Sequence, residues 1–526
     1  MRTDRLCQVL AGYPDRAQAR LLERGFCEGF VIPSTVQGGR LAVRNLKSIG
    51  EQEGVAREKV AKEVALGRVS GPHPLPPWED LVVSPLGIVP KKEPGRFRLI
   101  HHLSHPEGES VNDGIPPELC SVQYASVDDA VELVRKAGPG AEMAKADIES
   151  AFRLLPVHPV SFRLLGFRLG GGFYFDKCLP MGCAISCAYF EAFSTFLEWL
   201  LGRQHPEGSR LHYLDDFLFV GEAGTGHCRG LLRAFARLAE WLGVPLAPDK
   251  TEGPATRITF LGIELDSRAG VCRLPECKVR ELRECIENLL ASKKATLLEL
   301  QQLVGRLNFA GRVIPAGKVF AKRLTRLTAP LARSGHRTRL PVGVRLDLEQ
   351  WLRFLAHFNG VLLWKDPWTP ASHLSLYTDA AGGEGFGAIL GNSWCAERWP
   401  DSWVQAGLTT NITLLELFPI VVAFVVWERQ LRNKQVVLWS DNQAVVQLIN
   451  NNSARCPRVL ALLRRLVRSQ LEGNLAVRAR HVAGVQNEVA DALSRFQWQR
   501  FRALAPQADK RGTAIPDDIW RTVELP

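Results

Sequence analysis

Two adjacent aspartates interrupt an apolar, aromatic segment, and this feature constrains the fold more than any other. The segment reads HYLDDFLFVG and places Asp215 and Asp216 where a single strand would have no reason to carry two carboxylates. The pair fits a tight turn between two strands, because Asp is a common turn residue. Taken by itself, the pair is most simply interpreted as a solvated hairpin turn.

Neighbouring motifs favour a different interpretation of this pair. Asp147 ends an apolar, strand-like segment in MAKADIESAF, and the glycine-bearing LPMGCAIS lies between the two carboxylate positions. Upstream, LGIVPKKEPGRFRLIHHLS predicts a basic hairpin around a Lys-Lys-Glu-Pro-Gly turn. Two Mg²⁺ ions about 4 Å apart need hard oxygen ligands from separate strands, and cationic side chains hold a triphosphate. The combination therefore predicts phosphoryl transfer between nucleotides.

The stretch from about residue 83 to residue 262 resembles a reverse transcriptase. The motifs that carry the resemblance follow the family's order: VPKKEPGRFRLI, KADIESAF, LPMGCAIS, YLDD, APDKTEG and FLG. The resemblance implies that Asp147, Asp215 and Asp216 form the metal-binding carboxylate triad of a polymerase. It also implies a right-hand fold with fingers and palm.

The same resemblance assigns roles to cationic and aromatic residues around the triad. Arg98, with Lys91 or Lys92, would contact the incoming triphosphate. Lys250 would lie near the pyrophosphate, where it can donate a proton. Tyr213 matches the aromatic residue of the YxDD motif and would touch the primer end or the minor groove.

Three further residues concern the nucleotide itself. Phe152 matches the family's steric-gate aromatic, a ring that packs under the sugar and excludes a 2′-hydroxyl, although a core phenylalanine is the alternative. Met181 departs from the family's pattern, because many retroviral-type enzymes carry Gln there. A hydrogen bond credited to that side chain is therefore in doubt, whereas Gly182 keeps the close backbone approach.

A second set of carboxylates follows in the C-terminal half. Glu416 sits in the almost wholly apolar TLLELFPIVVAFVVW, and a buried lone carboxylate is costly unless it is paired, protonated or metal-bound. A ligand role is therefore favoured for Glu416. Asp379 follows a strand and precedes a glycine-rich turn, Asp441 ends a strand before a helix, and Asp491 lies on the first turns of the last helix.

The order and spacing of these four carboxylates resemble a ribonuclease H domain over about residues 370 to 496. The segment HVAGVQNEVADALSR is close to the retroelement form. The resemblance implies that Asp379, Glu416, Asp441 and Asp491 bind metal for hydrolysis of the RNA strand of an RNA–DNA hybrid. His481 matches the family's mobile histidine, with a structural surface histidine as the alternative. Each active site would take two Mg²⁺, and Mn²⁺ could replace them.

These motifs predict a multidomain protein with α+β and α/β parts. The expected order is an N-terminal extension of unknown role over 1–70, polymerase fingers and palm over 71–270, a helical thumb and connection over 271–369, a ribonuclease H-like domain over 370–496, and a tail over 497–526. Loose structure followed by one helix is expected in the extension, and no clear period is visible in the tail.

Local patterns predict individual elements inside these domains. Helices are expected over 127–137 and 188–202, and strands over Leu211–Val220 and Ile258–Leu265. LSLYTDA, FGAIL and QVVLWSD predict strands of the second α/β part.

The combined architecture is typical of retroelements. The chain is most similar to DIRS-like retrotransposons, which pair with a tyrosine recombinase, in the segments SPLGIVPKKEPGRFRLIHHLSHPEGESVNDGI and NFAGRVIPAGKVF. Gypsy-like and pararetroviral elements are the alternatives. The resemblance implies an RNA template, a DNA primer, an RNA–DNA hybrid and dNTPs as partners, and leaves room for a separately encoded tyrosine recombinase and capsid-like protein. The formal charge of +11 favours such polyanionic partners.

Other sequence features bear on location and on the competing function. No secretory signal and no apolar run of the ~20 residues needed to span a bilayer is visible, so an intracellular protein, cytoplasmic or nuclear and without a membrane partner, is expected. A catalytically inactive, retroelement-derived nucleic-acid-binding protein is the alternative function. The intact carboxylates count against it, because metal-site acids repel each other without their ions.

Overall fold

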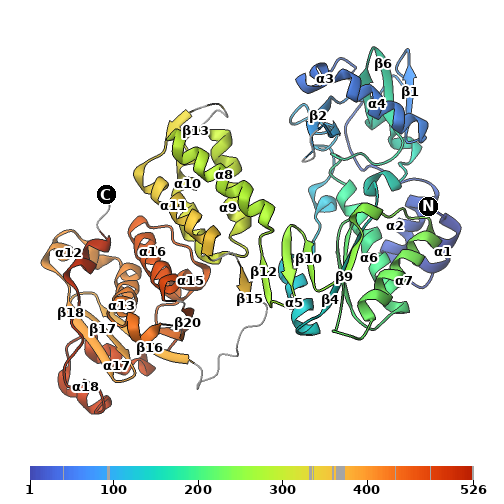
Figure 1. Cartoon of the computed structure of the whole chain (residues 1–526). Helices are drawn as coiled ribbons and strands as arrows, with labels where there is room; N and C mark the ends of the chain where they lie inside the picture. The colour runs from blue at the N-terminus through green and yellow to red at the C-terminus, as the bar shows by residue number, and fades with distance from the viewer. Residues whose placement is uncertain are drawn as a thin grey trace. The chain divides into compact units, whose positions relative to one another are not determined.

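The computed structural model describes residues 1–39, 41–91, 95–330, 335, 337–357, 360–362, 373–432, 434–473 and 475–523. The chain divides into two compact units, residues 1–272 and 273–526, and each unit combines helices with sheets (Figure 1). The predicted mixed α/β multidomain class is therefore confirmed. In the part of the chain that the structure describes, no helix has both the length and the apolar character needed to cross a membrane.

Unit 1 alternates helices with short strands. Its helices are α1 (Thr3–Leu10), α2 (Arg16–Cys27), α3 (Lys47–Glu51), α4 (Glu53–Ala65), α5 (Val127–Ala137), α6 (Ser186–Gln204) and α7 (His227–Leu242). Its strands are β1 (Val69–His73), β2 (Leu86–Pro90), β3 (Phe97–His101), β4 (Glu142–Asp147), β5 (Gly166–Leu169), β6 (Gly172–Asp176), β7 (Ser209–Tyr213), β8 (Asp216–Gly221), β9 (Glu252–Ala255), β10 (Arg257–Phe260), β11 (Ile263–Asp266) and β12 (Val271–Arg273), which reaches the boundary of the unit.

The antiparallel sheet β7-β8-β4-β9 forms the centre of unit 1. A two-residue turn joins β7 to β8: Tyr213 pairs with Asp216, and Leu214 takes a positive φ of 52°. This is the turn that the sequence predicts for the two aspartates. Phe217 is fully buried against Phe235 of α7, with ring centroids 4.4 Å apart. Because successive side chains of a strand point to opposite faces, this packing fixes the orientation of the strand that starts at Asp216.

The N-terminal helices pack on the same core. Leu6 of α1 and Leu22 of α2 are fully buried, α1 contacts α7, and α2 contacts α6. The Asp15 side chain caps α2 by accepting hydrogen bonds from the first turn of the helix. The expectation of loose structure before the first helix is therefore wrong, because both segments are amphipathic and bury an apolar face.

The basic hairpin predicted upstream of the first aspartate is present as β2 and β3. Arg98 pairs with Val89 in its register, and Ile88 lies in a small core with Val60 of α4. The helix expected near residue 60 is α4. Lys92 lies outside the described residues, so its predicted contact has no structural description here.

The single strand expected over Ile258–Leu265 is instead a hairpin of β10 and β11. Phe260 pairs with Ile263, and the two intervening residues, Leu261 and Gly262, have positive φ of 45° and 78°. Two successive positive φ angles suit a two-residue turn that matches the twist of the strands. The apolar run hides this turn, because only Gly262 is a typical turn residue.

Unit 2 begins with helices and continues as a second sheet with helices around it. Its helices are α8 (Glu276–Ser292), α9 (Leu297–Ala310), α10 (Lys318–Thr328), α11 (Val342–His357), α12 (Asp401–Gln405), α13 (Ile412–Val426), α14 (Glu428–Leu431), α15 (Gln443–Asn451), α16 (Pro457–Glu472), α17 (Glu488–Ser494) and α18 (Trp498–Leu504). Its strands are β13 (Lys294–Thr296), β14 (Arg337–Arg339), β15 (Val361–Leu362), β16 (His373–Ala381), β17 (Gly385–Leu390), β18 (Ser393–Arg398), β19 (Gln435–Ser440) and β20 (Ala476–His481).

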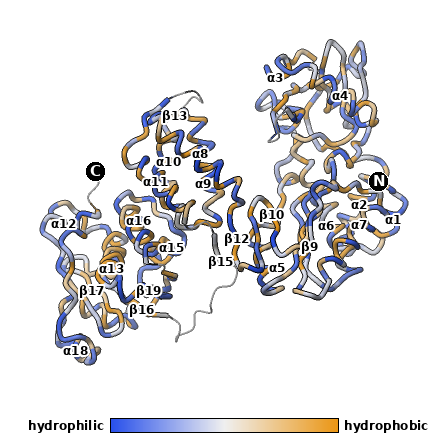
Figure 2. The backbone as a smooth tube through the Cα atoms, in the orientation of Figure 1, coloured by the Kyte–Doolittle hydropathy of each residue, from blue (hydrophilic) through white to orange (hydrophobic). Residues whose placement is uncertain are grey.

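The sheet of unit 2 has the order β18-β17-β16-β19-β20, with β16 at its centre. β16, β17 and β18 are antiparallel neighbours, whereas β19 and β20 run parallel to β16. Helix α13 packs against β16 and α16 and is apolar nearly all round, as its hydropathy shows (Figure 2). A helix of this kind must be buried on all sides, so the carboxylate it carries is buried with it.

The C-terminal tail belongs to the core of unit 2. Phe501 of α18 is fully buried, with its ring centroid 5.2 Å from that of Trp394 in β18. Trp520 stacks on Phe418 of α13 at 4.9 Å. The tail lacks a sequence period because it is anchored by widely spaced aromatic residues rather than by one amphipathic helix.

Candidate active sites

Asp147, Asp215 and Asp216 meet at one end of the β7-β8-β4-β9 sheet. Asp147 is the last residue of β4 and pairs in register with Asp216, the first residue of β8. Asp215 lies in the β7–β8 turn, where its backbone carbonyl accepts a hydrogen bond of 3.0 Å from the N–H of Ile148. The structure thus brings together the three carboxylates that the sequence singles out.

The three carboxylates repel one another in a partly buried site. Burial, a hydrogen bond with Asp147 and the charge of Asp215 raise the pKa of Asp216 to about 7. Burial and the charge of Asp147 also raise the pKa of Asp215, although Lys250 and Arg98 oppose them. Hard oxygen donors that repel each other this way are the donor set that Mg²⁺ or Mn²⁺ prefers, so the residues fit divalent cations.

Lys250 partly neutralises this site. Its ammonium nitrogen lies 2.8 Å and 2.9 Å from the two carboxylate oxygens of Asp147. Burial lowers the pKa of Lys250, but the hydrogen bond and charge of Asp147 outweigh burial and raise it. Arg98 of β3 is exposed and close enough to act on the charge of Asp215. Lys91 is exposed at the end of the β2–β3 hairpin, where its N–H bonds to the carbonyl of Arg96.

Phe152 follows the first aspartate on the 3₁₀ turn Ala151–Leu154. Its ring is half-buried and meets Phe190 of α6 edge to face, with centroids 5.7 Å apart. The side chain therefore lies at the rim of the core, which is compatible with a gate and with a core residue. Tyr213 has its ring centroid 4.9 Å from that of Tyr124.

The glycine-bearing loop approaches β3 closely. Gly182 has a φ of +117°, and a Cβ at this position would lie 2.5 Å from the carbonyl oxygen of His101. Only glycine fits there. Met181 beside it is 45% exposed, so its side chain is available to a ligand rather than used in packing.

Sequence reasoning misses two buried ion networks around this site. Arg153, next to Phe152, donates to Asp176 at 2.7 Å and to Glu63 of α4 at 3.0 Å. This network ties the 3₁₀ turn to α4. An arginine directly after the gate position in an apolar sequence is the signal that could have revealed it.

The second network holds the strand that leads to the paired aspartates. His212 of β7 bonds through Nδ1 to Glu198, and its Nε2 lies 3.2 Å from Glu191; both glutamates are on α6. Burial lowers the pKa of His212, but the two carboxylates outweigh burial and raise it to about 9. The charged imidazole thus ties β7 to α6.

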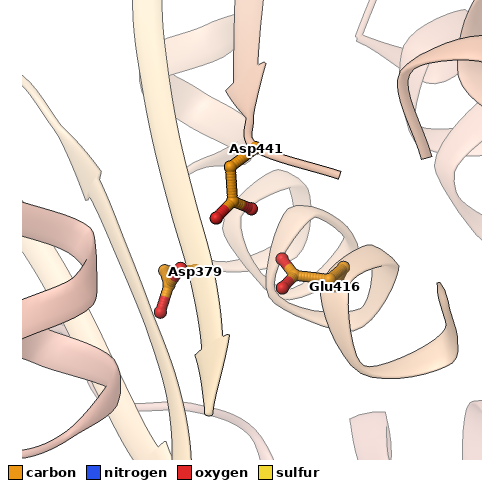
Figure 3. A group of neighbouring side chains, drawn as sticks. All are labelled: Asp379, Glu416 and Asp441. Atoms are coloured by element: carbon orange, nitrogen blue, oxygen red, sulfur yellow. The ribbon is translucent and has the colours of Figure 1, made fainter. Parts of the chain in front are cut away.

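A second carboxylate cluster lies in unit 2. Asp379 of β16, Glu416 of α13 and Asp441, directly after β19, offer oxygen atoms within 4.8 Å of one another (Figure 3). Asp379 and Glu416 are buried, and Oε2 of Glu416 is buried with no hydrogen-bond partner among the described residues. A buried carboxylate oxygen without a donor is costly, so a divalent cation fits this cluster.

Burial dominates the electrostatics of the cluster. Burial and the charges of Asp379 and Asp441 raise the pKa of Glu416 to about 9. Burial also raises the pKa of Asp379 to about 6, opposed by a hydrogen bond of 2.5 Å from the Ser494 hydroxyl and reinforced by Asp441 and Asp491. Without a cation, the cluster therefore holds a proton at neutral pH.

Asp491 of α17 acts on the charge of Asp379 but is not part of this close group. Its Oδ1 accepts a hydrogen bond of 2.7 Å from Arg495, and its Oδ2 one of 2.5 Å from Arg500. Burial raises the pKa of Asp491, but these hydrogen bonds outweigh burial and lower it. His481, the last residue of β20, is exposed, and its Nε2 donates to the carbonyl of Asp441 at 3.1 Å.

Comparison with known proteins places part of the chain in a family. Residues 89–265 match the family model described as reverse transcriptase (RNA-dependent DNA polymerase). Protein P of duck hepatitis B virus is 29% identical over 164 residues, which are 31% of this chain and 20% of that protein. The Transposon Tf2-3 polyprotein of Schizosaccharomyces pombe is 23% identical over 248 residues, 47% of this chain and 16% of that protein. The aligned part is thus about a fifth or less of these relatives' length.

Solved structures show a related fold. The foamy viral protease-reverse transcriptase dRH in complex with double-stranded DNA is 16% identical, with a TM-score of 0.50 over 91% of this chain and 82% of that one. The foamy viral protease-reverse transcriptase in complex with an RNA/DNA hybrid is 16% identical, with a TM-score of 0.50 over 91% of this chain and 63% of that one. The chain therefore has the palm, fingers and thumb fold of such polymerases. Residues 89–265 are a reverse transcriptase domain of the retroelement and viral type.

Proposed function

We propose that this protein is the RNA-directed DNA polymerase of a retrotransposon and that it also hydrolyses the RNA strand of RNA–DNA hybrids. One observation carries the proposal: Asp147, Asp215 and Asp216 meet at the end of one sheet inside the segment that matches the reverse transcriptase family. The function is an inference from this site and not from the whole relatives, of which the chain covers a small part.

In the proposed polymerase, the three aspartates hold two Mg²⁺, with Mn²⁺ as a substitute. Two bound ions would stabilise the attacking 3′ oxygen and the leaving pyrophosphate. Arg98, with Lys91 or Lys92, binds the triphosphate through charge-assisted hydrogen bonds.

The other polymerase residues act on the nucleotide and on the leaving group. Lys250 sits on Asp147 and donates a proton to the pyrophosphate as it leaves. Phe152 excludes the 2′-hydroxyl, Gly182 and the exposed Met181 line the nucleotide, and Tyr213 touches the primer end. The exposure of Met181 supports its role, and the ring of Phe152 at the core rim is compatible with a gate.

In the proposed hydrolase, Asp379, Glu416 and Asp441 would hold one divalent cation, and Asp491 would contribute to binding a second. The orphaned Oε2 of Glu416 supports this assignment. Bound cations would activate water and stabilise the leaving 3′ oxygen. His481, exposed beside Asp441, moves a proton or assists product release.

The source of the protein is part of the same proposal. The sequence motifs favour a DIRS-like retrotransposon, and a separately encoded tyrosine recombinase and a capsid-like protein are the proposed further partners. RNA template, DNA primer, RNA–DNA hybrid and dNTPs are the proposed substrates. The solved neighbour's complex with an RNA/DNA hybrid supports a hybrid as a ligand.

The test is incorporation of labelled dNTP on a primed RNA template with Mg²⁺, beside an Asp215→Asn, Asp216→Asn double variant. Extension by the natural protein alone supports the polymerase, and release of labelled RNA from a hybrid, lost in Asp379→Asn, supports the hydrolase. A folded protein that binds hybrid but does neither would instead be the inactive, retroelement-derived binding protein.

A further inference from the structure

The fourth carboxylate of the second site is held by two arginines, and one of them comes from the C-terminal tail. Arg495 lies one helical turn after Asp491 and donates a hydrogen bond to Oδ1 of Asp491. Arg500 belongs to α18 and donates to Oδ2 of the same carboxylate. Arg500 also donates to Oε1 of Gln497 at 2.9 Å and lies 3.8 Å from Glu488. Both oxygens of Asp491 are therefore occupied by guanidinium donors.

The remaining three carboxylates differ from Asp491, because among the described residues no arginine hydrogen bond to them is seen and Asp379 accepts one from the neutral Ser494 hydroxyl. Asp379, Glu416 and Asp441 gather within 4.8 Å, and the buried Oε2 of Glu416 has no partner among the described residues. A first cation thus finds its ligands available. A second cation that uses Asp491 would have to displace a charge-assisted hydrogen bond, which is about twice as strong as a neutral one.

Arg500 belongs to a helix that is packed in the core, so the fold itself places the Arg500 side chain beside Asp491. Phe501, the next residue, is fully buried against Trp394, and Arg502 donates to the carbonyls of Ala508 and Asp509 at 3.0 Å. The side chain of Arg500 is nevertheless 40% exposed. It can therefore leave Asp491 for an anion without unpacking the helix.

A backbone phosphate of nucleic acid has the chemistry to take this guanidinium. Phosphate oxygens accept two parallel hydrogen bonds from one arginine, a geometry that a single carboxylate oxygen does not offer. We propose that Arg500 is a positioning residue that keeps the second cation position closed until a phosphate of bound nucleic acid removes it from Asp491. This inference rests on the hydrolase part of the proposed function.

Direct counting of bound Mn²⁺ by electron paramagnetic resonance tests this inference without measuring activity. The full chain is used with Asp215→Asn and Asp216→Asn, so that the polymerase site does not contribute. In this background, Arg500→Gln should bind a second Mn²⁺ about tenfold more tightly than the parent. Arg511→Gln, at an exposed tail arginine, is the matched control for loss of one positive charge.

A DNA duplex supplies the phosphate in a second arm, since it has no RNA strand to cut. In the presence of the duplex the parent protein should bind a second Mn²⁺, and Asp491→Asn should abolish binding of this second ion. Equal affinities in Arg500→Gln and Arg511→Gln, or no gain with duplex, would overturn the role of Arg500. If Asp379→Asn leaves all Mn²⁺ binding unchanged, the proposed hydrolase site itself fails, which is a separate result from an Arg500 variant without effect.

Discussion

The ammonium nitrogen of Lys250 lies 2.8 Å from Oδ1 and 2.9 Å from Oδ2 of Asp147, so one lysine spans both oxygens of a buried carboxylate. The side chain of Lys250 is 58% exposed, whereas that of Asp147 is 7% exposed. A flexible cation thus neutralises the first aspartate from the solvent side. Asp491 is also held by basic side chains, with Arg495 on one oxygen and Arg500 on the other, so each site has one carboxylate bound by cations.

Lys250→Met should slow dNTP incorporation by about 100-fold, because general acid groups contribute on the order of 10²–10⁴ in rate. The variant also loses the cation that neutralises Asp147. Single-turnover incorporation on a primed template measures the effect. Lys136→Met, at an exposed lysine on α5, is the control. A rate equal to that of the control would mean that Lys250 has no part in proton transfer.

Asp215→Asn should abolish polymerisation and leave hybrid degradation intact, because the two carboxylate clusters are built by different units. Asp379→Asn should do the reverse. Primer extension and release of labelled RNA, measured on the same preparations, check both directions. Loss of both activities in a folded single variant would contradict the separation of the sites.

Phe152→Val should raise the ratio of ribonucleotide to deoxyribonucleotide incorporation by about 10- to 100-fold. The smaller side chain leaves room for a 2′-hydroxyl, and steric exclusion of one small group has an effect of this order. The kcat/KM ratio for one rNTP and its dNTP measures it. Phe162→Val is the control, because it makes the same substitution at a ring that packs on Phe175 rather than on Phe190. Unchanged discrimination would make Phe152 a core residue.

The His212 network predicts a pH-dependent stability of unit 1. Its pKa of about 9, against an ordinary value of 6.5, means that the folded state binds this proton more tightly than the unfolded state. The stabilisation is therefore fully present below pH 6.5 and is lost as the pH rises through 9. It amounts to up to about 3 kcal/mol.

Hydrogen exchange of α6 amides at pH 6.5 and pH 9, compared at equal intrinsic rates, measures this loss. His212→Gln keeps hydrogen-bonding capacity but cannot become charged, so its stability should depend less on pH over this range. His158→Gln, in which a histidine outside the network is changed, is the control. Parallel pH profiles of the His212 variant and the natural protein would show that the imidazole is not charged in the fold.

Sequence reasoning succeeds where chemistry and local structure coincide. Asp215 lies in the turn that the neighbouring residues predict, with Asp216 directly after it, and Glu416 is buried because its helix is apolar nearly all round. Sequence reasoning fails where an interaction joins residues distant in the sequence, or where a turn forms without typical turn residues. Leu261 adopts a positive φ that its residue type disfavours, and the link between His212 and Glu198 exists only once α6 packs on β7.

The predicted set of four carboxylates shows both cases. Asp379, Glu416 and Asp441 gather as expected, because the neighbouring strands β16 and β19 and the apolar helix α13 bring them together. Asp491 is at the expected position in the chain, but Arg495 and Arg500 hold its side chain. The ion pair with Arg495 can be predicted from the sequence, because the two residues are one helical turn apart. The ion pair with Arg500 forms only because α18 packs beside Asp491.

Cation binding at the Asp379, Glu416 and Asp441 cluster should release about one proton near pH 7. Glu416, with a pKa of about 9, is protonated there, whereas Asp379, with a pKa of about 6, is mostly ionised. A carboxylate must be deprotonated to bind a cation, so Mn²⁺ affinity should rise about tenfold per pH unit between pH 7 and 8. Calorimetry in buffers of different ionisation enthalpy counts the protons, in the Asp215→Asn, Asp216→Asn background to exclude the other site. The Glu416→Gln variant should bind Mn²⁺ more weakly and release no proton. If the heat of Mn²⁺ binding to the protein with Glu416 unchanged does not depend on the buffer, Glu416 is not protonated before the cation binds.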